Sequence, residues 1–254
     1  MIGRISMAAV CAAALCANAA RAEEAPLTFV TTSKLKALTE GPPAKWDFTL
    51  IDARTRVEYA EGHIAGAQSC PASEVASQLP SMVPDRSHRL VFYCNGPKCT
   101  KSQKAAHAAI ALGYSNVLEY NEGLPAWREA KLPVIGSPLP MFDPPAVSAE
   151  SLQQVRETRD RPLLVDVRDR AEFEALHIAG SVNIPLDDLQ ERAARFPEGR
   201  RIVLVDHSGH QVAIAARVLK HAGHGNDLEK LEGGVALWQQ KKLPLLTGAT
   251  IANR

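Results

Sequence analysis

The chain has 254 residues, of which 46% are hydrophobic and 22% are charged. This balance suits one large domain or two of about 110 to 130 residues, and it excludes disordered, collagen-like and coiled-coil chains. The formal net charge of +1 indicates no surface for nucleic acid or for an anionic membrane.

The first 22 residues have the layout of a secretory signal peptide. Arg4 gives a positive start, residues 7–20 are an uncharged apolar run, and Ala20-Arg21-Ala22 is a small-x-small cleavage site. The apolar run is short for a bilayer of about 30 Å, so we expect cleavage rather than anchoring, with no membrane association afterwards. Cleavage leaves 27 basic and 28 acidic residues, a net charge of −1. We therefore expect a periplasmic protein.

The rest of the chain contains a repeat. Short motifs of the first half recur 114 residues later, and further motifs recur at slightly smaller offsets. The matched pairs are Leu50-Ile51-Asp52-Ala53-Arg54 with Leu164-Val165-Asp166-Val167-Arg168, Glu58 with Glu172, His63-Ile64-Ala65-Gly66 with His177-Ile178-Ala179-Gly180, Glu122-Gly123 with Glu232-Gly233, and Trp127 with Trp238. We infer two copies of one domain, at residues 23–132 and 146–247. The proline-rich residues 133–145 form an extended linker between them.

Strands and helices are expected to alternate within each copy. Apolar runs at 48–51, 90–93, 163–167 and 202–205 are typical of buried parallel strands. Helices are expected at 34–38, 102–112, 149–155 and 211–222, with Ser33 and Ser148 as N-caps of the first and third. The expected fold class is α/β, with two tandem domains that each hold a small parallel sheet covered by helices on both faces. Such sheets bind ligands beyond the carboxyl ends of their strands.

Cys94 lies at such a strand end. A short loop with Gly96 and Pro97 follows it, and a helix begins directly after the loop. Loop N–H groups and the helix N-terminus would both stabilise a thiolate, which is the nucleophilic form of cysteine. Lys98 and Lys101 add mobile positive charge for an anionic substrate. The alternative is a buried structural cysteine or one half of a disulfide, and this arrangement favours the nucleophile.

Several separated motifs resemble the rhodanese domain. In the first copy they are Asp52-Ala53-Arg54, Glu58-Tyr59, Gly62-His63-Ile64-Ala65-Gly66-Ala67, Tyr93-Cys94, Glu122-Gly123 and Trp127. In the second copy they are Asp166-Val167-Arg168, Glu172-Phe173, His177-Ile178-Ala179-Gly180, Asn183-Ile184-Pro185, Glu232-Gly233-Gly234 and Trp238. The resemblance implies a tandem rhodanese-type sulfurtransferase.

In such an enzyme Cys94 would take the outer sulfur of thiosulfate or a related donor and hold it as a persulfide. It would then pass the sulfur to cyanide, a small thiol or a protein acceptor. The resemblance implies no cofactor, and it gives Asp52 and Arg54 a mainly structural role. The substrate-binding loop is expected to comprise Asn95, Gly96, Pro97, Lys98, Cys99, Thr100 and Lys101.

The loop departs from the common family pattern. The distance from Cys94 to Gly113 exceeds that from Asp206 to Gly223 by two residues. Longer loops accompany phosphatases and arsenate reductases in this superfamily, but those enzymes grip the oxyanion with an arginine. No arginine lies between Cys94 and Ser102, which disfavours that function.

Three cysteines follow the signal peptide, so at least one thiol is unpaired within the chain. Cys99 could displace the persulfide sulfur or form a disulfide with Cys94, or it could simply fill the loop. Cys70 stands where the second copy has Ile184, and we expect it in the core.

The second copy has Asp206 where the nucleophile belongs, so we expect it to be inactive. His207 and His210 are weak evidence for a metal site, and we expect none. His63 and His177 are expected to be structural, and Trp127 and Trp238 to lie in the core. Two alternative functions stay open: a periplasmic sulfur-carrier or binding protein, and a thiol redox protein that uses Cys94 and Cys99.

Overall fold

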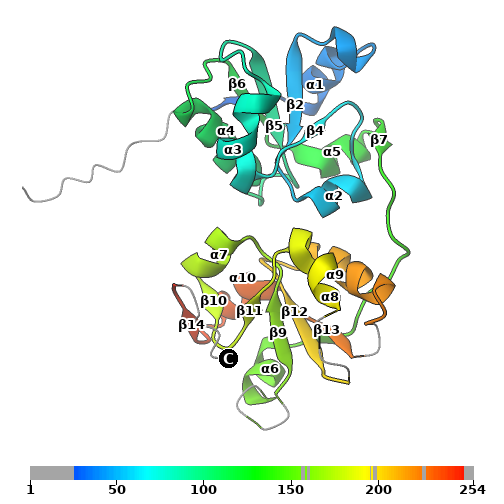
Figure 1. The fold of residues 1–254 in the computed structure, drawn as a ribbon, viewed down its shortest axis with the longest axis vertical. Coiled ribbons are helices and arrows are strands. Elements are labelled where there is room, and N and C mark those ends of the chain that lie inside the picture. The colour runs from blue at the N-terminus through cyan, green and yellow to red at the C-terminus, as the bar shows by residue number, and fades with distance from the viewer. Residues whose placement is uncertain are drawn as a thin grey trace, which may run out of the picture.

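The computed structural model describes residues 26–155, 158, 161–194, 196, 199–224 and 227–248. The signal peptide expected at residues 1–22 lies outside them. Within the described part, no helix is both long enough and apolar enough to span a bilayer. Two α/β domains follow one another along the chain, as Figure 1 shows, and residues 136–145, which contain no helix or strand, connect them.

The first domain is built on a five-stranded parallel sheet. The strand order is β1 (Thr28–Phe29), β6 (Val117–Tyr120), β5 (Arg89–Tyr93), β2 (Phe48–Asp52) and β4 (Gln68–Ser69). Its helices are α1 (Thr32–Leu38), α2 (Arg56–Glu61), α3 (Val75–Met82), α4 (Lys101–Ala111) and α5 (Gly123–Glu129), with two 3₁₀ turns, η1 (Pro43–Lys45) and η2 (Ala72–Glu74). The expected α/β class is confirmed.

Alternating side chains of the central strands build two cores, one on each face of this sheet. Ile51 and Phe92 pack with residues of α3 and α4. Leu50 and Val91 point the other way and pack with residues of α1 and α5. Because both faces are covered, the central strands are mostly apolar, which is why they could be recognised as short hydrophobic runs.

The second domain repeats this topology. Its parallel sheet has the order β8 (Ala146–Val147), β13 (Leu228–Leu231), β12 (Ile202–Val205), β9 (Leu163–Asp166) and β11 (Val182–Asn183). Its helices are α6 (Ala149–Val155), α7 (Arg170–Ala175), α8 (Leu189–Ala193), α9 (His210–His221) and α10 (Gly234–Gln240), with the 3₁₀ turn η3 (Leu186–Asp188). The tandem repeat read from the motifs is therefore a repeat of structure as well.

Two details differ from the expectations. The first helix starts at Thr32, and Thr31 rather than Ser33 is its N-cap, because the Thr31 side chain accepts from the Lys34 N–H. Part of the proline-rich segment pairs: β7 (Val134–Ile135) is antiparallel to β3 (His63–Ile64), as β14 (Leu245–Leu246) is to β10 (His177–Ile178). Ser148 caps α6 as expected, since its hydroxyl accepts from the Ser151 N–H at 3.2 Å.

Candidate active site

The loop after β5 curls back over its own cysteine. Gly96 has φ +96°, a conformation that glycine adopts without strain, and the Cys99 N–H donates to the Gly96 carbonyl at 2.9 Å. Helix α4 begins two residues later, at Lys101. The turn brings the second half of the loop over Cys94, whose side chain is fully buried.

Gly123 has to be a glycine because the loop leaves no room for a side chain there. A Cβ on this residue would come within 2.4 Å of the Gly96 nitrogen and 2.5 Å of the Cys94 carbonyl oxygen. The next residue, Leu124, donates its N–H to the same Cys94 carbonyl at 2.9 Å. The start of α5 therefore fixes the backbone of the nucleophile, which gives the Glu122-Gly123 motif a physical reason.

Several groups surround the Cys94 sulfur and act on its ionisation. A hydrogen bond from the Cys99 thiol has the largest effect, and the Ser102 hydroxyl and the N–H groups of Ser102 and Gly96 act in the same direction. Burial opposes them, but together they lower the pKa of the Cys94 thiol to about 7. The Cys99 carbonyl oxygen, 3.1 Å from the sulfur, accepts from the thiol form. A large share of Cys94 is thus thiolate at neutral pH.

Ser102 links the sulfur to a buried carboxylate. Its hydroxyl lies 3.1 Å from the Cys94 sulfur and donates to Glu119 Oε1 at 2.7 Å. Ser102 is fully buried and Glu119 is 3% exposed. A single hydroxyl proton serves both neighbours, so the carboxylate and the thiolate compete for it.

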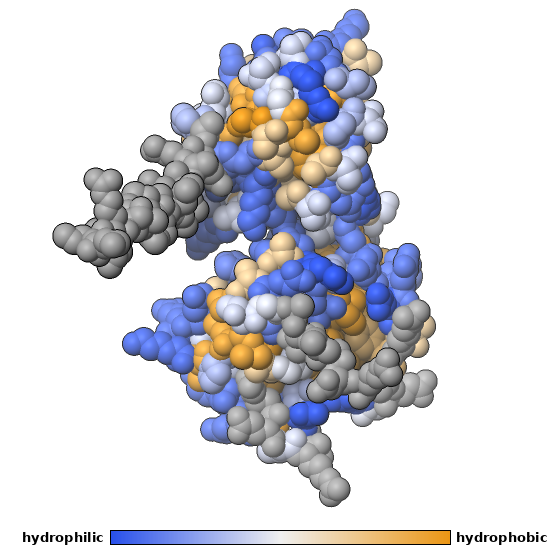
Figure 2. Space-filling model, turned by 60° about the vertical axis from the view of Figure 1, so that its left-hand side comes forward, coloured by the Kyte–Doolittle hydropathy of each residue, from blue (hydrophilic) through white to orange (hydrophobic). Residues whose placement is uncertain are grey.

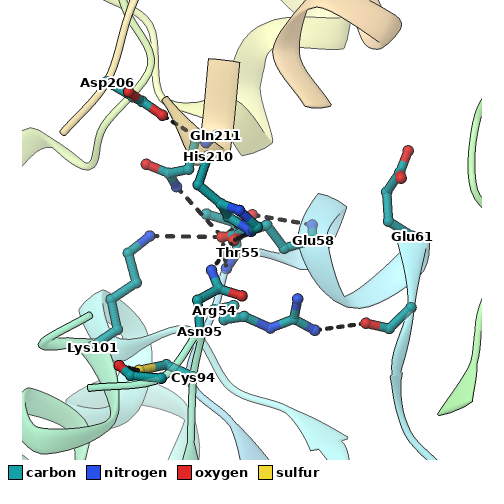
Figure 3. A network of polar contacts seen from close by, with 12 residues as sticks. Arg54, Thr55, Glu58, Glu61, Cys94, Asn95, Lys101, Asp206, His210 and Gln211 are labelled. Atoms are coloured by element: carbon teal, nitrogen blue, oxygen red, sulfur yellow. Dashed lines mark hydrogen bonds and ion pairs between the residues drawn. The ribbon is translucent and has the colours of Figure 1, made fainter. Parts of the chain in front are cut away.

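A second buried carboxylate, Glu58 on α2, holds the loop from the other side. Its Oε1 accepts from Asn95 Nδ2 at 2.6 Å, and its Oε2 lies 3.8 Å from Lys101 Nζ. Burial alone would raise the pKa of Glu58, but Lys101, Arg54 and the Asn95 hydrogen bond outweigh it and lower the pKa to about 2. Figure 3 shows Asn95 and Lys101 reaching Glu58 above Cys94. The anion therefore fixes both ends of the loop.

The second domain reaches the same carboxylate. At the start of α9, Gln211 Nε2 donates to Glu58 Oε2 at 3.4 Å, and His210 Nε2 lies 3.8 Å from Glu58 Oε1. Asp187 of the second domain accepts from the N–H groups of Arg56 and Val57 at 2.9 and 3.0 Å, at the start of α2. Helix α2 thus connects the docked second domain to the Cys94 loop.

A buried ion pair strengthens this docking. Arg217 of α9 lies 2.5 Å from Glu61 of α2, and each side chain is 11% exposed. In the space-filling view the molecule shows two lobes that meet at a narrower waist (Figure 2). A cavity of about 460 Å³ opens between the domains, lined by Thr55 and Lys101 from the first and by Arg170 and Asp187 from the second, among others.

The corresponding loop of the second domain also directs N–H groups at the side chain that follows the strand, but that side chain is the carboxylate of Asp206. The Asp206 side chain accepts from the N–H groups of Gly209, Gln211 and Val212 at 2.5, 2.6 and 3.1 Å. These donors satisfy an anion at a helix N-terminus, yet a carboxylate cannot accept a sulfane sulfur. The second domain therefore has no thiol at this position, and its inactivity stays a prediction.

The residues expected to form the substrate-binding loop differ in how exposed they are. Gly96 is buried, Asn95 and Cys99 are partly buried, and Pro97, Lys98 and Thr100 are exposed. Lys101 is not the mobile charge that was expected: its Nζ is held beside Glu58 and its side chain is 11% exposed. Lys98 is the remaining exposed cation of the loop.

Sequence reasoning missed three residues around Cys94, namely Glu58, Ser102 and Glu119. Glu58 was noted as part of the repeated motif, but without a role in the site. Nothing local in the sequence marks Glu119, because it acts through a contact 17 residues away along the chain.

The residues expected to be structural are so. Asp52 and Arg54 form a buried pair, with Arg54 Nε 2.9 Å from Asp52 Oδ1 and Arg54 Nη2 donating to the Gly62 carbonyl at 2.8 Å. Cys70 is fully buried in the core beside α3 and α4. The two histidines and two tryptophans are also packed: His63 stacks on Tyr59 and His177 on Phe173, while Trp127 and Trp238 are 3% and 0% exposed. Among the described residues, no group of three or more His, Cys, Asp or Glu side chains could hold a metal ion.

Fold and site together define an α/β protein with two copies of one domain, and in the first copy a buried cysteine lies just beyond the carboxyl end of the central strand β5. The family model described as "Rhodanese-like domain" matches residues 31–130 and again 148–241. The chain belongs to this family, with two tandem domains.

Curated relatives match one domain at a time. A "Putative sulfur carrier protein YrkF" from Bacillus subtilis is 35% identical over 79 residues, which are 31% of this chain and 43% of the relative. A "Sulfurtransferase" from Allochromatium vinosum is 30% identical over 100 residues, which are 39% of this chain and 92% of the relative. The chain spans 38% to 54% of the length of three curated relatives, the carrier among them.

One solved structure overlaps most of the chain at low similarity. The thiosulfate sulfurtransferase from Pseudomonas aeruginosa is 23% identical, and the match covers 88% of this chain and 44% of that one with a TM-score of 0.42. Family membership rests on the family model and on the relative from Allochromatium vinosum. These support sulfur transfer in general as the chemistry of the chain.

Proposed function

We propose that this protein is a periplasmic sulfurtransferase that moves a sulfane sulfur from thiosulfate or a related donor to a thiophilic acceptor through a persulfide on Cys94. The observation that carries the proposal is the Cys94 sulfur itself, buried beneath its loop, surrounded by donors and with its pKa lowered to about 7. Sulfur transfer in general is supported by the match to the rhodanese-like family and by two relatives that are named as a sulfurtransferase and a putative sulfur carrier. The donor, the acceptor and the compartment are parts of this proposal.

The first half-reaction is a displacement at sulfur. The Cys94 thiolate attacks the outer sulfur of thiosulfate, the S–S bond of the donor breaks with its electron pair, and sulfite leaves. The product is the Cys94 persulfide, whose outer sulfur carries the negative charge. The Ser102 hydroxyl and the loop N–H groups, which already act on the thiolate, are placed to stabilise this anion.

The second half-reaction regenerates the thiolate. A nucleophilic acceptor attacks the outer sulfur, the S–S bond of the persulfide breaks, and the electron pair returns to Cys94. With cyanide the product is thiocyanate, and with a thiol it is an acceptor persulfide. Lys98 is an exposed cation of the same loop and favours anionic donors and acceptors through charge attraction.

The first domain performs the chemistry and the second supports it. Cys94 has no counterpart thiol in the second domain, where Asp206 takes its position. The contacts of Gln211 and His210 with Glu58 place the second domain against the active loop. We infer that it holds the loop in its working geometry.

Steady-state turnover tests the proposal. Thiocyanate formation from thiosulfate and cyanide is measured for the wild-type protein and for Cys94→Ser, with Asp206→Asn as a matched control in the second domain. We expect turnover in the wild type and in the control, and none in Cys94→Ser. Equal turnover in Cys94→Ser would overturn the assignment of the nucleophile. Absence of turnover in folded wild-type protein with thiosulfate and with a cysteine persulfide as donor would overturn the function.

A further inference from the structure

The active loop contains a second thiol that faces the first. The Cys94 sulfur lies 3.1 Å from the carbonyl oxygen of Cys99, and the turn closed by the Cys99 N–H and the Gly96 carbonyl holds the two residues together. The Cys99 side chain hydrogen-bonds to the Cys94 sulfur. Cys94 is fully buried and Cys99 is partly exposed, so Cys99 lies on the solvent side of the pair.

The two thiols differ in which one keeps its proton. The hydrogen bond to Cys94 and burial raise the pKa of Cys99, whereas the pKa of Cys94 is lowered to about 7. When Cys94 is ionised, the proton that the pair keeps is therefore on Cys99. When Cys94 becomes a persulfide, its sulfur is the inner atom of an S–S bond, and the turn closed by the Cys99 N–H and the Gly96 carbonyl holds the Cys99 thiol in the same loop.

We propose that Cys99 discharges the Cys94 persulfide within the loop, releasing the sulfane sulfur as hydrosulfide and leaving a Cys94–Cys99 disulfide. This inference rests on the proposed function, because it needs the persulfide. It adds an activity, sulfide release without an external acceptor, to sulfur transfer.

The step balances without a further reactant. The Cys99 sulfur attacks the Cys94 sulfur, the S–S bond of the persulfide breaks, and its electron pair leaves with the outer sulfur. The proton of Cys99 goes to that outgoing sulfur, so the persulfide anion and one thiol become one disulfide and one hydrosulfide ion. The two cysteines are oxidised by two electrons, and the sulfane sulfur is reduced by two.

The third cysteine cannot replace Cys99. Cys70 is packed in the core beside α3 and α4, and burial raises the pKa of its thiol to about 11. Ser102 also touches the Cys94 sulfur, but a hydroxyl cannot form the disulfide. Cys70→Ala is therefore a matched control, since it removes a thiol that takes no part in the step.

A single-turnover experiment separates the steps. Fully reduced protein is mixed with thiosulfate in the absence of any acceptor thiol or cyanide, and sulfite, sulfide and the intact protein mass are followed in time. In wild type and in Cys70→Ala we expect one sulfite and one sulfide per chain, and a final mass short of two hydrogens. In Cys99→Ser we expect one sulfite, no sulfide, and a mass that keeps the added sulfur atom.

Two other results would count against the inference in different ways. If the wild type keeps the added sulfur for as long as Cys99→Ser does and releases no sulfide, the internal discharge is wrong while the persulfide stands. If neither protein releases sulfite or gains sulfur, the proposed function fails and the discharge step fails with it.

Discussion

Replacing Ser102 with alanine tests how the site ionises its nucleophile. The substitution removes the hydroxyl that lies 3.1 Å from the Cys94 sulfur and keeps the Ser102 N–H in place. The hydroxyl lowers the pKa of Cys94, so its loss raises that pKa. Hydrogen bonds to charged groups contribute about 1.5 to 3 kcal/mol, which corresponds to about one to two pH units in an ionisation midpoint.

The lower end of that range applies here. Glu119 accepts the same hydroxyl proton at 2.7 Å, so the thiolate has only a share of it. A rise of about one pH unit takes the thiolate fraction at pH 7 from about one half to about one tenth, and persulfide formation should slow about fivefold. At pH 9 the thiolate predominates in both proteins, and the two rates should nearly converge.

The assay is the rate of sulfite release in a single turnover with thiosulfate, measured from pH 5 to 10. Ser102→Thr keeps a hydroxyl and serves as the matched control, and urea unfolding checks that each variant is folded. An unchanged midpoint in Ser102→Ala, or a slowing of the same size at every pH, would refute the hydrogen-bond argument.

Three further changes address the surroundings of the site. Glu58→Gln should lower the free energy of unfolding by an amount on the order of 3 kcal/mol at pH 7, because the pKa of this carboxyl falls from its ordinary 4.5 to about 2 on folding. Measured by urea unfolding, the difference from wild type should shrink as the pH drops from about 4.5 towards 2. A difference that stays constant over this pH range would contradict the prediction. Arg217→Ala removes the ion-pair partner of Glu61 and should weaken domain docking by about 3 to 5 kcal/mol. A protease should then cleave within residues 133–145 faster in Arg217→Ala than in wild type or in Arg217→Lys. Equal cleavage rates in these three proteins would argue against the prediction. Asp206→Cys in a Cys94→Ser background should release sulfite from thiosulfate, because the N–H groups of three residues already donate to the side chain at this position. If the new thiol titrates at the ordinary pKa of cysteine, the loop of the second domain does not stabilise a thiolate.

The sequence predicted what depends on neighbouring residues. The hydrophobic runs marked β2, β5 and β12, because buried parallel strands are apolar on both faces. The position of Cys94 between a strand and a helix predicted that N–H groups surround its side chain, and the structure places the Ser102 and Gly96 N–H groups there; its role as the nucleophile stays a prediction. The repeated motifs predicted two copies of one domain, which the structure and the family model confirm, and the two sheets share one strand order.

What stayed hidden depends on contacts between distant segments. Lys101 appeared to be a mobile charge, but Glu58, 43 residues earlier in the chain, holds it in place. The Gln211 contact with Glu58 depends on how the domains dock, which no local pattern records. The sequence could not predict that Thr31 rather than Ser33 is the N-cap of α1, because both hydroxyl residues lie within one turn and only the backbone geometry decides between them.

The most direct test of the account is the mass of the protein after charging with thiosulfate, measured in Cys99→Ser so that the sulfur cannot leave through the loop. The account predicts a gain of one sulfur atom per chain, located on the peptide that contains Cys94 and removed by cyanide. The double variant Cys94→Ser, Cys99→Ser should gain nothing. A folded Cys99→Ser protein that releases no sulfite and gains no sulfur would contradict the central claim that Cys94 is a sulfur-transferring nucleophile.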